Sequence, residues 1–103
     1  MENDTVDCFN RNIERGDIVV IGKGGIQIAF FIKNQRSFQF IPITQWVADF
    51  IVKNNRLWQV GYMKYYSHLI LRIDREYFEN NLLLEADKND YETIKNYVDG
   101  KQL

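Results

Sequence analysis

The 103-residue chain has few of the side chains that build catalytic and metal sites, with one cysteine, Cys8, and one histidine, His68. A single cysteine excludes an intrachain disulfide and a zinc site made of thiolates. A nucleophilic pair of Cys8 with His68 is disfavoured, because the residues around Cys8 are acidic and oppose a thiolate. The sequence therefore predicts no enzymatic activity, no metal and no cofactor.

Long apolar runs are also absent. No stretch approaches the roughly 20 apolar residues that a transmembrane helix needs. The N-terminus, MENDTVDCFN, is acidic where a signal peptide is first basic and then apolar. Together with the single cysteine, these features predict a cytoplasmic protein without a membrane segment.

Proline occurs once, and no tract rich in glycine, serine or proline interrupts the chain. With 46% hydrophobic and 26% charged residues, the composition is that of a globular protein with one modest core. The sequence therefore predicts a single domain over residues 1–103, in which residues 1–12 form a loose N-terminal segment.

Three strands are predicted in the first part of the chain. The run at residues 18–21 is fully apolar, which is typical of a buried strand. In residues 26–33, Ile26, Ile28, Phe30 and Ile32 are expected to point one way and the residues between them the other, and residues 36–41 repeat this period of two with Phe38 and Phe40 on one face. Pro42 is expected to end the third strand, because proline has no N–H for the ladder.

The spacing of apolar residues becomes helical after Thr44, which is a predicted N-cap. Trp46, Val47, Phe50 and Ile51 are expected to share the buried side of this helix. Further aromatic residues are expected to fill the core as well, because each buries a large area. The core is the prediction for most of the aromatic residues Phe30, Phe38, Phe40, Trp46 and Phe50.

Two more strands are predicted at residues 57–62 and 68–73, and a C-terminal helix at residues 88–100. Asn89 and Glu92 match the capping-box pattern at the start of this helix, and Gly100 is placed to end it.

The resulting order, β-β-β-α-β-β with a C-terminal helix, indicates an α+β fold. Two architectures fit this order. One is a small, strongly bent antiparallel sheet, and the other is an OB- or SH3-like barrel of about five strands.

A glycine cluster, Gly22-Lys23-Gly24-Gly25, lies between the first two predicted strands. A phosphate-binding loop needs GxxxxGK[ST] before a helix, and a dinucleotide fingerprint needs GxGxxG, and neither pattern is present. Glycines do supply the positive φ angles of tight hairpin turns. We therefore interpret the cluster as a hairpin turn, with Lys23 at its tip.

Aromatic residues make up 15% of the chain and often stand beside basic residues, above all between residues 56 and 66. Residues 11–75 hold ten basic and four acidic residues, a net charge of +6, whereas both ends of the chain are acidic. Exposed aromatic and cationic side chains are typical of protein interfaces and of surfaces that stack single-stranded bases. The predicted partner-binding residues are Arg56, Trp58, Tyr62, Lys64, Tyr65, Tyr66, Lys23 and Arg36.

Two functions fit this pattern. In the first, the chain is a small non-enzymatic module that binds another protein; in the second, a basic and aromatic sheet face binds single-stranded nucleic acid. The acidic sequence pI of 5.8 favours the first, because free nucleic-acid binders are usually basic. A homo-oligomer fits either function.

The many Asn, Ile, Lys and Tyr residues resemble the composition of AT-rich bacterial and phage coding sequences. Small phage proteins often bind a host protein and block it. The resemblance therefore implies a phage or mobile-element protein that binds a host factor.

A salt titration separates the two functions. We expect no binding to single-stranded oligonucleotides even at about 50 mM salt, where phosphate contacts are strong. Binding that weakens steeply as salt rises would instead favour the nucleic-acid hypothesis.

Overall fold

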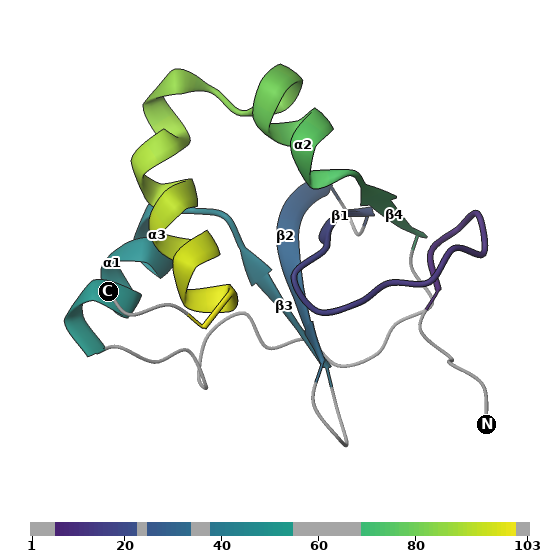
Figure 1. Ribbon diagram of the computed structural model, residues 1–103, viewed down its shortest axis with the longest axis horizontal. Coiled ribbons are helices and arrows are strands. Elements are labelled where there is room, and N and C mark those ends of the chain that lie inside the picture. Colours follow the sequence, from purple (N-terminus) through teal and green to yellow (C-terminus); the bar gives the residue numbers. More distant parts are fainter. Residues whose placement is uncertain (1–5, 23–24, 34–37, 55–68, 101–103) are drawn as a thin grey trace.

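A computed structural model describes residues 6–22, 25–33, 38–54 and 69–100 (Figure 1). Within these ranges, four antiparallel strands form one open sheet in the order β3-β2-β1-β4. The strands are β1 (Ile18–Gly22), β2 (Ile26–Lys33), β3 (Phe38–Pro42) and β4 (Leu69–Ile73).

Helices follow β3 and β4. Helix α1 (Gln45–Asn54) connects the sheet to the part of the chain before β4. After β4 come the short helix α2 (Arg75–Tyr77), a π-helical turn (Phe78–Leu82), a 3-10 turn (Glu85–Asp87) and helix α3 (Lys88–Val98). None of these helices has the length and apolar character needed to cross a membrane.

The predicted α+β fold with an antiparallel sheet is confirmed. The barrel and the five-strand count are not confirmed, because the described strands number four and form an open sheet. The predicted strand at residues 57–62 lies outside the described residues. Strands β1 and β2 are antiparallel neighbours with Gly22 paired to Ile26, as expected of a hairpin. Lys23 and Gly24 lie outside the described residues.

Both faces of the sheet are apolar. On one face, side chains of β1, β2 and β3 pack against α1, α3 and the π-helical turn. On the other face, a second cluster includes Ile13 from the N-terminal segment. The buried residues of the first cluster are Ile18, Phe30, Ile32, Ile41, Val47, Ala48, Ile51, Phe78, Tyr91, Ile94 and Val98, and those of the second are Ile13, Val19, Ile21, Ala29, Phe31 and Phe40.

The buried side of α1 differs from the prediction. Val47, Ala48 and Ile51 are buried, whereas the side chain of Trp46 is 57% exposed, so its assignment to the core was wrong. Positions 47, 48 and 51 share one side of a helix, and residue 46 lies about 100° around the axis from residue 47. Phe50 is half-buried at the border of this side.

Helix ends agree with the sequence in part. The hydroxyl of Thr44 accepts a hydrogen bond from the N–H of Val47 at 3.4 Å, which is the predicted N-cap. The predicted capping box is wrong, because α3 begins at Lys88 and Asn89 therefore lies inside the helix. Gly100 follows α3 with a φ of 80°, a left-handed conformation that glycine adopts without strain.

The N-terminal segment is bound to the free edge of β4 (Figure 1). The N–H of Cys8 donates to the carbonyl of Ile70 at 2.8 Å. The carboxylate of Asp7 accepts the N–H of Arg72 at 3.0 Å, and the guanidinium of Arg11 donates to the carbonyl of Arg72 at 2.7 Å. Side chains thus occupy backbone groups that an unprotected edge strand offers to other chains. The sequence predicts a loose segment at residues 1–12 and does not indicate these contacts.

Asp7 holds this segment together. Its side chain is fully buried and forms an ion pair of 2.7 Å with Arg11. It also accepts the N–H groups of Phe9 at 3.0 Å and Arg11 at 2.9 Å. Burial by itself would raise the pKa of Asp7, but these hydrogen bonds favour the ionised form and hold the pKa far below its usual range.

We predict that Asp7→Asn lowers the free energy of unfolding by about 2 to 3 kcal/mol at pH 7, because it removes the ionised acceptor from several hydrogen bonds. The folded-state pKa of Asp7 is depressed. Its contribution is therefore complete above about pH 4 and is lost as the pH falls further. Urea unfolding at pH 7, 4 and 2 measures the difference between the two proteins.

Asp49→Asn on the exposed side of α1 is the matched control, with an expected change below about 0.5 kcal/mol. A wild-type advantage over Asp7→Asn that stays constant from pH 7 to pH 2 would contradict this role of the carboxylate.

Candidate interaction site

The partner-binding residues predicted from the sequence lie outside the described residues, and so does His68. These are Arg56, Trp58, Tyr62, Lys64, Tyr65, Tyr66, Lys23 and Arg36. The candidate site is therefore built from other residues.

Among the described residues, no group of three or more His, Cys, Asp or Glu side chains could hold a metal ion. Cys8 is exposed in the N-terminal segment. Besides the Asp7–Arg11 pair, charged side chains come together in two networks on the helices, and both networks join elements of the fold.

Arg75 is the centre of the first network. Its guanidinium forms two hydrogen bonds of 3.1 Å with the carboxylate of Asp99, and it donates to the carbonyl of Gly16 at 2.7 Å. Its charged group also lies 5.4 Å from the centre of the Phe30 ring. These contacts tie the start of α2 to the end of α3 and to the turn before β1.

The second network joins the π-helical turn to α3. The hydroxyl of Tyr91 donates to Glu79 at 2.6 Å, and Lys95 lies 3.4 Å from the same carboxylate oxygen. The hydrogen bond from Tyr91 lowers the pKa of Glu79, and Lys95 adds to this effect. Burial, together with the Glu79 charge, raises the pKa of Tyr91, so the phenol stays protonated.

The ring of Tyr91 anchors the same region. It is buried and stacks on Phe30 of β2 at a centroid distance of 5.5 Å. It also contacts Phe78 at 5.4 Å. The network is therefore a structural link between sheet, turn and helix, and it offers no free acid or base to a substrate.

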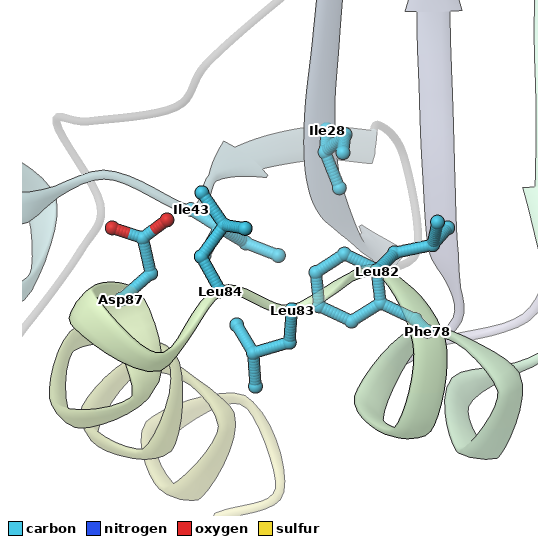
Figure 2. Close-up of a pocket in the computed structure, with 7 residues that line it drawn as sticks. All are labelled: Ile28, Ile43, Phe78, Leu82, Leu83, Leu84 and Asp87. Carbon is cyan, nitrogen blue, oxygen red and sulfur yellow. The ribbon is translucent and has the colours of Figure 1, made fainter.

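An apolar pocket of about 170 Å³ lies next to Phe78, the residue that contacts Tyr91 (Figure 2). This volume is below the roughly 300 Å³ at which pockets for small molecules begin. It suits a single large side chain. The lining residues are Ile28 of β2, Ile43 of the β3–α1 connection, Phe78 and Leu82 of the π-helical turn, and Leu83, Leu84 and Asp87 of the link to α3.

The backbone explains how the pocket forms. The N–H of Leu83 donates to the carbonyl of Phe78 at 2.9 Å, which closes the wide π-helical turn. Leu83 and Leu84 then adopt extended conformations before the 3-10 turn. On the other side, the N–H of Ile43 donates to the carbonyl of Ile28 at 3.1 Å and keeps these two walls together. A π-helical turn often marks a functional site.

The walls of the pocket reach the surface. Leu84 is 66% exposed and Leu82 is 42% exposed. Ile26, which is 81% exposed, lies on the same face of β2 as Ile28, because alternate residues of a strand share a face. Exposed apolar side chains grouped around a hollow are typical of a binding surface.

A carboxylate completes the pocket. Asp87 lines it and occupies the N-cap position of α3, where its side chain makes no capping hydrogen bond. Within the described residues, this carboxylate has no ion-pair or hydrogen-bond partner. Glu85 and Asp90 stand in the same stretch of chain, and the neighbouring base, Lys88, lies 3.5 Å from Glu85. The pocket is thus apolar inside and acidic at its rim.

Sequence reasoning missed these residues. None of them is among the predicted partner-binding residues. The signal was the run Leu82-Leu83-Leu84, followed by Glu85 and Asp87. Three consecutive leucines cannot all face one side of a helix or a strand, so at least one must point away from the others.

The described residues define an α+β protein in which four antiparallel strands form one sheet with helices against one face. Comparison with known protein families, with curated proteins and with solved structures finds no significant match.

We predict that Tyr91→Phe raises the pKa of Glu79 toward its ordinary value, because the hydroxyl is the largest stabiliser of the ionised carboxylate. NMR titration of the Glu79 carboxyl carbon measures this change. Tyr77→Phe is the control, because Tyr77 is exposed and its hydroxyl is not part of the network. An unchanged Glu79 titration in Tyr91→Phe would contradict the assignment.

Proposed function

We propose that the protein is a small binding module that docks on another protein through the apolar pocket between β2 and residues 78–87, which connect α2 to α3. The observation that carries this proposal is the exposed pair Leu82 and Leu84 at the entrance of a pocket sized for one side chain. Such pockets commonly receive the buried anchor residue of an interface.

The charge at the rim supports a protein partner over nucleic acid. Asp87 lines the pocket, and Glu85 is close to it in the chain. Carboxylates repel the phosphates of a nucleic acid, which in contrast require cationic contacts. The composition adds the hypothesis that the partner is a host protein of a phage or mobile element.

The test compares two serine substitutions at exposed apolar residues. Leu84→Ser changes the pocket entrance, and Val52→Ser changes a residue of α1 that is similarly exposed, at 69% against 66%. A protein captured from extract of the source cells is purified, and its dissociation constant is measured by calorimetry. We expect Leu84→Ser to weaken binding by about tenfold, as a residue in a binding hot spot does, and Val52→Ser to leave it unchanged.

Both variants are first compared with the wild type by circular dichroism and urea unfolding. Because both residues are exposed, we expect native folding. A partner that binds the Leu84→Ser protein as tightly as the wild type would overturn the proposed docking site.

A further inference from the structure

The unpartnered carboxylate of Asp87 restricts what the pocket can receive. It lies at the rim beside Leu84 and Ile43, as Figure 2 shows. A partner that fills the pocket brings its neighbouring side chains close to this carboxylate. An opposite charge there is favourable, whereas a second carboxylate is repelled and a bulky apolar group desolvates the charge without compensation.

The surrounding chain strengthens the same preference. Residues 76–103 include seven acidic and three basic side chains, which gives this stretch a net charge of −4. Lys95, one of the bases, is already engaged by Glu79 and Glu92 at 3.4 and 3.5 Å. Lys88 is engaged by Glu85. These bases are engaged by other acids, and Asp87 therefore keeps its capacity for a cation from a partner.

The pocket also restricts the shape of the partner. It has room for one large side chain, and the carboxylate is next to the entrance. An apolar residue and a lysine or arginine three or four positions away lie on one face of a helix, with side chains close enough to make both contacts. Helices that place an apolar face in a groove are a common form of peptide recognition.

From this geometry we infer that the pocket selects a cationic amphipathic helix of its protein partner, with a large apolar residue in the pocket and a basic residue one turn away against Asp87. The inference rests on the proposed function and specifies the chemistry of the partner.

The test uses two synthetic helical peptides as probes. They share the same leucine positions and length, and they differ in that the polar face carries lysine in one and glutamate in the other. Fluorescence anisotropy gives the affinity of each peptide for the full chain at low and high salt. We expect the lysine peptide to bind more tightly, and raised salt to reduce its advantage, because the contact with Asp87 is exposed to solvent.

Reversing the charge of Asp87 tests whether this carboxylate causes the preference for the lysine peptide. Asp87→Lys is expected to lower the preference for the lysine peptide by about fivefold, the size of one exposed ion pair. Asp49→Lys, which makes the same charge change on the exposed side of α1, is the matched control and should preserve the preference. Backbone NMR shifts caused by the lysine peptide are expected at residues 82–87 and absent at Val52.

The outcomes separate this inference from the proposed function. If both peptides bind equally and Leu84→Ser weakens both, the cationic partner is overturned while the docking site stands. If neither peptide binds and a natural partner ignores Leu84→Ser, both fail. Self-association that Leu84→Ser abolishes, measured by analytical ultracentrifugation, would assign the pocket to a second copy and overturn the inference.

Discussion

The middle of strand β2, Ala29, Phe30 and Phe31, is buried on both faces of the sheet, and this constraint governs the rest of the structure. Phe30 points toward the helices, whereas Ala29 and Phe31 point to the opposite side. A strand with apolar side chains on both faces is stable only if both faces are covered. On the helical side, Tyr91 stacks on Phe30 and fixes α3 across the sheet. On the other side, Ile13 brings the N-terminal segment into the second cluster.

The apolar pocket forms where the chain between α2 and α3 covers the helical face of the sheet. Phe78 packs inward against Tyr91, and the π-helical turn that begins at Phe78 does not bury all three leucines of residues 82–84. Leu83 contacts the core, whereas Leu84 faces the solvent. The chain thus exposes apolar surface directly beside its acidic segment. We proposed a cationic and amphipathic protein segment as the partner because apolar walls with the carboxylate of Asp87 beside them suit such a segment better than nucleic acid.

The N-terminal segment covers the open edge of β4. An edge strand presents unpaired backbone groups to other chains. Here Asp7 and Arg11 bind the N–H and C=O of Arg72 with their side chains. A buried carboxylate is costly unless it is paired and hydrogen-bonded, and Asp7 meets both conditions. These side chains therefore cover the β4 edge of the sheet, whereas the pocket beside β2 is uncovered in the structure.

Local patterns in the sequence determined the first three strands, the hairpin turn at Gly22, the cap at Thr44 and the helical C-terminus, because each depends on neighbouring residues alone. Tertiary structure decided which side of α1 is buried, and therefore that Trp46 is exposed. It also decided the burial of Asp7 and the position of Leu84 and Asp87 beside Ile28 and Ile43. These features arise from contacts between distant segments, such as Asp7 with Arg72, and no local periodicity encodes them.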